Sequence, residues 1–163
     1  MSRAFVKEGT GELDPLPDLP LSPHPNYVTP SGLAQLRARL AEVQARLADL
    51  RARPDRLDKL PEAAAERDIR YLEARLRTAI LVTPDAAPVE VAFATAVTVA
   101  DEDGTETVWR IVGEDEADAA RGWIAPHSPL ARALIGARVG DSVTWRRPNG
   151  AVELDILAIG PAP

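Results

Sequence analysis

The stretch Leu33-Ala-Gln-Leu-Arg-Ala-Arg-Leu-Ala-Glu-Val-Gln-Ala-Arg-Leu-Ala-Asp-Leu50 decides the fold of the first half of the chain. Its leucines and its valine recur at alternating spacings of three and four residues, which is the heptad pattern of a coiled coil. Thr29 precedes it as a helix cap, and Pro30 suits the first helical position, where the amide is unpaired anyway. The pattern predicts an amphipathic helix that begins after Thr29 and is stopped by Pro54.

A second heptad segment follows, with Pro61 in its first turn. Its apolar positions are Ala65, Ile69, Leu72, Leu76 and Ala79. Two heptad helices joined by the short loop 54–60 predict an antiparallel coiled-coil hairpin over residues 29–82. Helices of about 20–24 residues would project about 30–36 Å at 1.5 Å per residue. An antiparallel pair buries its own seam, and a bundle formed by two copies is the alternative.

The rest of the chain divides into three further segments. Residues 1–28 hold five prolines and predict a flexible leader, or a strap on a partner or on this chain. Residues 83–88 read as a linker. Residues 89–160 predict a small antiparallel sheet with strands over 90–99, 105–112, 142–146 and 152–159, and a short helix from Ser128-Pro129 to Gly136. The expected class is therefore α+β, a helical hairpin followed by a small sheet domain.

Composition excludes several classes of protein and of site. The chain of 163 residues has a net charge of -6 and no cysteine, which removes disulfides and thiolate metal sites. It has neither an apolar run of membrane-spanning length nor a signal peptide, so we expect a cytoplasmic protein with no membrane partner. Residues 29–82 carry eleven Lys/Arg against eight Asp/Glu, whereas residues 89–163 carry six against twelve. This asymmetry favours a partner with surfaces of both signs, or simply two solvated faces.

The expected hairpin tip is the one place where the sequence suggests site chemistry. Asp55, Asp58 and Glu62 put carboxylates, the ligand type that Mg²⁺ prefers, at the end of an arm. Such ligands would bind magnesium weakly alone, but they can complete the coordination of a metal held elsewhere. Acids near a helix start also simply complement the helix dipole. None of the common nucleotide-binding, zinc-protease or serine-hydrolase motifs is present.

Two ungapped blocks in the second half carry a family resemblance. They are Ile111-Val-Gly-Glu-Asp-Glu-Ala-Asp118 and Ser128-Pro-Leu-Ala-Arg-Ala-Leu-Ile-Gly-Ala-Arg-Val-Gly-Asp141. Together they resemble the C-terminal domain of the bacterial Gre factors, the transcript-cleavage elongation factors. The entry into the first helix, Tyr27-Val-Thr-Pro-Ser-Gly-Leu33, is also similar. The order of hairpin and small domain is that of the family.

The resemblance implies a fold, a partner and roles for particular residues. It implies an FKBP-like small domain without prolyl isomerase activity, which docks on RNA polymerase at the rim of the secondary channel. The implied docking residues are Asp118, Ser128, Pro129, Leu130 and Arg132. The hairpin would enter the channel with its basic residues facing nascent RNA; these are Arg51, Arg53, Arg56 and Lys59. The tip acids Asp55 and Asp58 would share the polymerase's magnesium, so the protein is expected to have no cofactor, no small-molecule substrate and no enzymatic activity of its own.

The tip departs from the family pattern in chemistry and in length. Asp55 and Asp58 keep an acid-x-x-acid spacing, but the Glu-Asn of the family is absent, and each helix is shorter by roughly two to three turns. A non-cleaving homologue that occupies the channel and competes with cleavage factors is therefore an alternative to a cleavage factor. Two others are a prolyl isomerase with a pocket floored by Trp123 or Trp145, and a coiled-coil scaffold.

Overall fold

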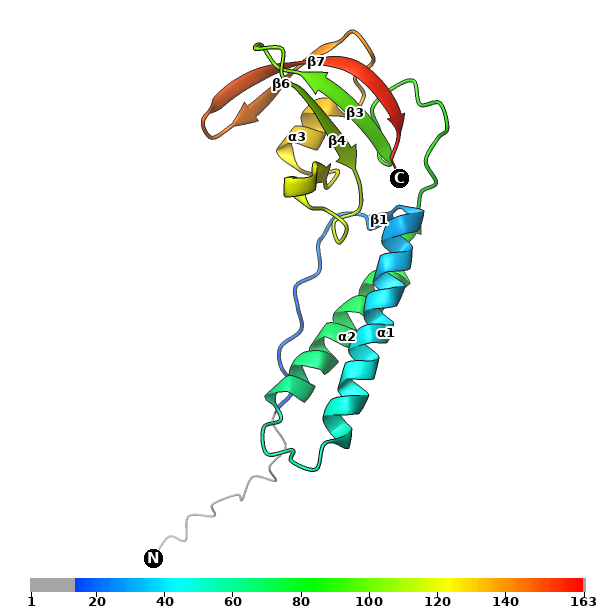
Figure 1. The fold of residues 1–163 in the computed structure, drawn as a ribbon, viewed down its shortest axis with the longest axis vertical. Coiled ribbons are helices and arrows are strands. Elements are labelled where there is room, and N and C mark those ends of the chain that lie inside the picture. Colours follow the sequence, from blue (N-terminus) through cyan, green and yellow to red (C-terminus); the bar gives the residue numbers. More distant parts are fainter. Residues whose placement is uncertain (1–13, 163) are drawn as a thin grey trace, which may run out of the picture.

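The computed structural model describes residues 14–162, which form an elongated molecule with a helical hairpin at one end and a curled sheet at the other (Figure 1). The elements run in the order β1, α1, α2, β2, β3, β4, η1, β5, α3, β6, β7. This arrangement confirms the predicted α+β class. Within residues 14–162, no helix is long and apolar enough to cross a membrane.

The hairpin consists of α1 (Pro30–Ala52) and α2 (Leu60–Thr78). The Thr29 side chain caps α1 by accepting a hydrogen bond from the amide of Gly32, as its position before Pro30 predicts. At 1.5 Å per residue, α1 extends about 33 Å. The helices end and begin next to Pro54 and Pro61, so both proline signals in the sequence are confirmed.

The heptad positions form the seam between α1 and α2. The buried members of this cluster are Val28, Leu36, Val43, Leu47, Ala65 and Leu72. The other heptad leucines, Ile69 and Ala79 are partly buried against them. Because a fully buried leucine contributes about 1.5–3 kcal/mol, this single seam supplies most of the apolar stabilisation of the arm.

A two-residue ladder closes the base of the hairpin. β1 (Tyr27–Val28) and β2 (Ile80–Leu81) pair in parallel, one just before α1 and the other just after α2. Flanking hydrogen bonds from the amide of Ile80 to Asn26 O (2.8 Å) and from that of Val82 to Val28 O (2.9 Å) extend it. The chain therefore enters and leaves the arm at one fixed point.

The second half is a five-stranded sheet with the order β5-β4-β3-β7-β6. Its elements are β3 (Thr95–Ala100), β4 (Glu106–Ile111), the 3-10 helix η1 (Ala119–Arg121), β5 (Trp123–Ile124), α3 (Pro129–Leu134), β6 (Ser142–Arg147) and β7 (Gly150–Pro161). One face packs on α3 around a core that includes Val97, Ile111, Leu134 and Ile156. Trp109 and Trp145 also pack against this core, edge to face at 6.0 Å.

Two details of the sheet differ from the sequence expectation. The strand expected over 90–99 begins only at Thr95, because Val91 pairs instead with the segment after α3. Its amide bonds to Ala137 O at 2.8 Å, and its carbonyl accepts from the Gly136 amide at 2.7 Å. The sheet is also mixed rather than antiparallel, since the loop containing η1 returns the chain so that β5 runs parallel to β4.

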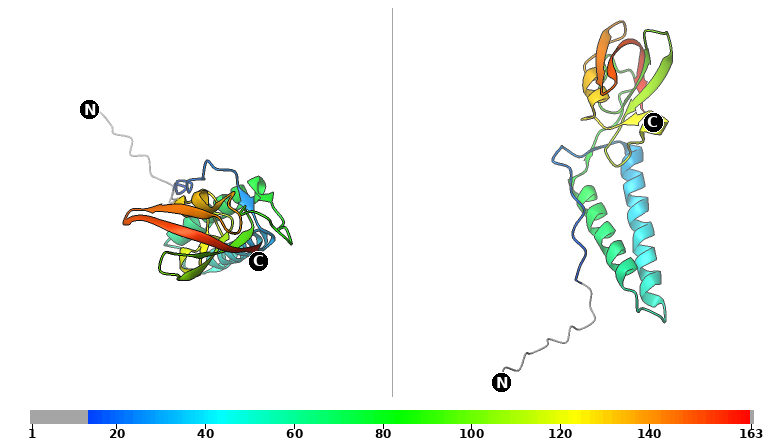
Figure 2. Two further views of the ribbon diagram at one scale, coloured as in Figure 1. Left: turned by 90° about the horizontal axis from the view of Figure 1, so that it is seen from above. Right: turned by 90° about the vertical axis from the view of Figure 1, so that its left-hand side faces the viewer.

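The described part of the proline-rich leader, residues 14–26, has no helix or strand. It runs alongside α2 on the side away from α1 and reaches β1 at the base of the hairpin (Figures 1 and 2). Residues 1–13, the rest of the leader for which the sequence predicts flexibility, lie outside the described residues.

Candidate functional site

The tip of the hairpin is the exposed loop between α1 and α2, and its two aspartates shape it. Asp55 Oδ1 accepts a hydrogen bond from the amide of Leu57 at 3.1 Å, and Asp58 Oδ1 accepts one from that of Leu60 at 3.0 Å. Each aspartate thus uses one carboxylate oxygen to turn the backbone. Leu57, between them, is 93% exposed at the apex.

Glu62, the third candidate acid, lies in the first turn of α2 and is only 7% exposed. The guanidinium of Arg56 donates to both its oxygens, at 2.9 and 2.6 Å, and Lys59 Nζ lies 3.6 Å away. The hydrogen bond from Arg56 holds the pKa of Glu62 below its usual range. Glu62 is therefore held in an ion pair at the start of α2, and its role as a candidate tip acid stays a prediction.

The tip does not fit a magnesium site of its own. Magnesium requires near-octahedral oxygen coordination. Of the three tip acids, Asp55 and Asp58 each keep one oxygen without a hydrogen bond, whereas both oxygens of Glu62 are bonded to Arg56. No group of three or more metal-binding side chains occurs among those residues. The two aspartates remain candidate ligands only for an ion that another protein holds.

The four basic residues expected to face RNA differ in whether they form ion pairs within the hairpin. Arg51 Nη2 lies 2.6 Å from Glu66 Oε1 across the hairpin, and both Arg56 and Lys59 pair with Glu62. Arg53, the exposed C-cap of α1, has no ion pair within the described part of the chain. That these residues face RNA stays a prediction.

Two of the five expected docking residues serve as local caps. Ser128 accepts a hydrogen bond from the Ala131 amide at the start of α3, and Asp118 accepts one from the Ala120 amide at the start of η1. Their side chains therefore fix the backbone at the starts of α3 and η1.

The remaining docking candidates divide between surface and core. Pro129 and Arg132 are exposed on α3. Leu130 is only 4% exposed and belongs to the core of the sheet domain. Its side chain packs inward, and its role in docking stays a prediction.

The junction between the hairpin and the sheet domain contains a buried charge cluster. Arg75 of α2 is 3% exposed, and its Nε donates to Asp115 Oδ2 at 2.6 Å while its Nη2 lies 3.6 Å from Glu114 Oε2. The Tyr71 hydroxyl donates to Asp115 Oδ1 at 2.5 Å. Burial, and then this hydrogen bond to a carboxylate, raise the pKa of Tyr71 to about 12.

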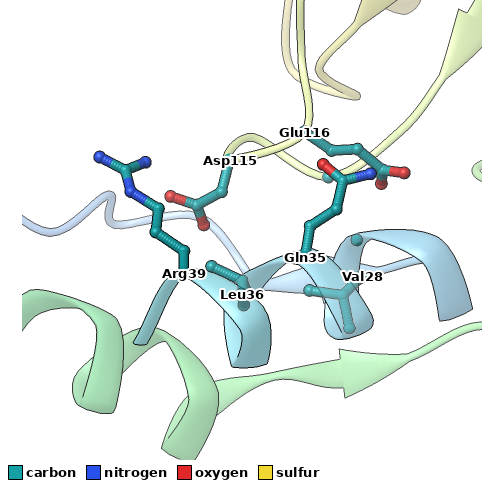
Figure 3. A pocket seen from close by; sticks show the side chains of 8 residues that line it. Val28, Gln35, Leu36, Arg39, Asp115 and Glu116 are labelled. Atoms are coloured by element: carbon teal, nitrogen blue, oxygen red, sulfur yellow. The ribbon is translucent and has the colours of Figure 1, made fainter. Parts of the chain in front are cut away.

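A second contact joins the sheet domain to the start of α1. The Thr29 hydroxyl donates to the buried carboxylate of Glu116, with its oxygen 2.9 and 2.7 Å from the two carboxylate oxygens. Gly32 makes this approach possible, since a Cβ there would lie 2.5 Å from Glu116 Oε2. Figure 3 shows Asp115 and Glu116 over α1, opposite Gln35 and Arg39, around a cavity of about 100 Å³.

This junction was not predicted from the sequence, although its signals were present. Glu114, Asp115 and Glu116 lie inside the block 111–118 that carries the family resemblance. The opposite charge balance of the hairpin and the sheet domain contributes to this junction, since Arg75 of the hairpin pairs with Asp115 and Glu114 of the sheet domain. The hairpin partners of these acids, Thr29, Tyr71 and Arg75, lie more than thirty residues earlier, so no local pattern links them.

The described chain is thus a two-part α+β protein, in which buried ion pairs join a helical arm to a small sheet domain. Residues 86–161 match the family described as transcription elongation factor GreA/GreB, C-terminal domain. This stretch, a little under half of the chain, is similar to the C-terminal domain of GreA and GreB.

Curated relatives give the extent of the similarity. The chain is 41% identical over 101 residues to transcription elongation factor GreA of Alkalilimnicola ehrlichii, covering 60% of this chain and 64% of the relative. Identity to GreA of Pseudomonas aeruginosa is 43% with the same coverage. Identity to GreB of Neisseria meningitidis is 43% over 96 residues, 58% of this chain and 59% of the relative. The chain thus matches less than two thirds of the length of these relatives.

Among solved structures, GreA factor homolog 1 (Gfh1) of Thermus thermophilus is 25% identical to this chain. The superposition covers 83% of this chain and 99% of that one, with a TM-score of 0.40. Such a score is too low to define a shared arrangement of the whole molecule.

Proposed function

We propose that the protein is a transcription elongation factor that binds RNA polymerase at its secondary channel. The similarity of residues 86–161 to the GreA/GreB C-terminal domain carries this proposal, together with relatives named as transcription elongation factors. The sheet domain would dock through the exposed side of α3 and the loop before it. The arm, about 33 Å long, would enter the channel with nascent RNA near its tip.

We further propose that the protein occupies the channel without supplying a complete set of tip ligands. Two-metal hydrolysis of a phosphodiester needs carboxylates that are free to hold an ion and orient water. Here Glu62 is neutralised by Arg56, and Asp55 and Asp58 each spend one oxygen on the loop. The protein would then compete with cleavage factors for the channel.

Stimulation of RNA cleavage is the second candidate function. It is favoured by the exposed, adjacent positions of Asp55 and Asp58, whose remaining oxygens can reach an ion that polymerase holds. In either case any reaction belongs to polymerase, and the protein acts in the cytoplasm with no substrate of its own.

A stalled, backtracked polymerase complex separates these functions. Purified protein is added in magnesium, and both binding and the length of the transcript's 3′ end are followed. Binding with intact RNA, and slower cleavage by a known cleavage factor, supports the occupant. Shortened RNA that depends on Asp55 and Asp58 supports a cleavage factor, and absence of binding refutes both.

The variant for this assay is Asp55→Ala combined with Asp58→Ala, and Glu42→Ala combined with Asp49→Ala, at exposed positions of α1, is the charge-matched control. If the tip acids act on the metal, the double variant loses cleavage and keeps binding. Cleavage that survives in the double variant rules out their role as ligands.

A further inference from the structure

The leader is held near the middle of α2 by one arginine. Arg70 Nε donates to Asp18 Oδ1 at 2.6 Å, and Arg70 Nη2 donates to Leu16 O at 2.8 Å. The side chains of Arg70 and Asp18 are 38% and 75% exposed, so solvent and salt reach this pair. Exposed ion pairs of this kind contribute little to stability.

Nearer to β1 the leader is held by both parts of the molecule. The Ser22 hydroxyl donates to Glu114 Oε1 at 2.7 Å, and the His24 ring stacks on His127 with centroids 4.3 Å apart. Both of these partners belong to the sheet domain. On the helical side, the side-chain amide of the buried Asn26 donates to the backbone oxygen of Arg75 at 2.7 Å.

The two halves of the leader differ in the burial of their polar contacts, although open space lies beside both. A cavity of about 310 Å³ lies between the first half and α2, with Asp18 and Leu19 in its lining. Another, of about 370 Å³, has Ser22 and Asn26 in its lining. The difference is therefore one of attachment, since Asn26 is only 5% exposed whereas the Asp18 side chain is 75% exposed.

We propose that residues 14–21, the distal leader, form a salt-sensitive latch that Asp18 closes on Arg70. Residues 22–26, the proximal leader, form its fixed base and bridge α2 to the sheet domain. Opening of the latch uncovers Arg70 beside an open cavity and leaves the junction unchanged. While the latch is closed, the carboxylate of Asp18 occupies the guanidinium that an external anion would otherwise contact.

The absence of cysteine allows a direct test by paramagnetic broadening. A nitroxide on Glu73→Cys, an exposed position of α2 in the cavity lining, is the only attachment site in the chain. In low salt it should broaden the amide signals of Asp18 and Leu19. Most of this broadening should disappear in about 1 M NaCl, where the Debye length is about 3 Å. The Asn26 side-chain amide signals should stay in place.

Two substitutions of the leader separate the ion pair from net charge. Asp18→Asn should raise the ratio of open to closed latch in low salt by up to about fivefold, whereas Asp14→Asn removes the same charge from an exposed neighbouring position and should leave the ratio unchanged. The proposal is overturned if the unsubstituted leader shows no broadening, or if salt and Asp18→Asn leave the broadening intact. It is also overturned if the Asn26 signals shift together with those of Asp18, since the leader would then release as one unit.

Discussion

Replacing Arg75 with methionine should destabilise the molecule much more than the same change at Arg70, on the same helix. Arg75 is 3% exposed and binds Asp115, whose side chain is 15% exposed. Removing one member of a buried ion pair costs about 3–5 kcal/mol, because the other charge is left unpaired. Asp115 keeps the hydrogen bond from Tyr71, so we expect the lower end, about 3 kcal/mol. For a chain of this size that corresponds to a fall in Tm of about 6–12 °C.

Two spectroscopic probes report on the two parts of the molecule separately. All three tryptophans lie in the sheet domain, whereas most of the helix lies in the hairpin. In the unsubstituted protein the junction couples the two parts, so the urea unfolding transitions followed by tryptophan fluorescence and by circular dichroism at 222 nm should coincide. In Arg75→Met the two transitions should separate, because the junction that couples the parts is lost.

Arg70→Met is the matched control for this measurement. It breaks an exposed pair with Asp18, which is worth about 0–1 kcal/mol. Combining Arg75→Met with Asp115→Leu should recover part of the loss, since the double change removes the unpaired carboxylate. If Arg75→Met and Arg70→Met lower stability equally, and the two probes still coincide, the junction is not held by Arg75.

Three further predictions follow from burial and backbone geometry. Because folding raises the pKa of Tyr71 to about 12, the contribution of Tyr71 to stability should be complete below about pH 10 and lost as the pH rises to 12. Absorbance titration at 295 nm should show an ionisation phase at high pH that disappears in Tyr71→Phe and remains in the control Tyr27→Phe. Leu130→Ala should cost about 2–5 kcal/mol in urea unfolding, whereas Arg132→Ala, on the exposed face of the same helix, should stay within about 0.5 kcal/mol; equal losses would contradict the burial. Gly113→Ala places a Cβ 2.8 Å from the Tyr27 backbone oxygen and should lower Tm, and an unchanged Tm would mean that β1 shifts freely.

The hairpin could be predicted from the sequence because its signals are local and repeat. The heptads place Leu36 and Leu72 on the seam, and Thr29 before Pro30 marks the start of α1. Each of these inferences needs only neighbours within a few residues. The same holds for Ser128, whose position before Pro129 predicts the cap of α3.

The parts that could not be predicted depend on contacts between distant segments. Val91 is a residue type that favours strands, but its backbone hydrogen bonds are made with the turn after α3. The buried ion pairs of the junction join Arg75 to acids about forty residues later in the chain. The leader has no periodicity at all, and its attachment depends on single side chains such as Asp18. Periodic patterns do not encode such pairings.

Because the parallel ladder fixes the base of the arm, the length of the arm can vary without a change at the base. β1 and β2 fix where the chain enters and leaves, while everything beyond them is a repeating seam. Seven residues inserted into each helix would preserve the seam and move the tip outward by about 10 Å. Reach can therefore change in whole heptads, in evolution or by design, without rebuilding the domain from which the arm projects.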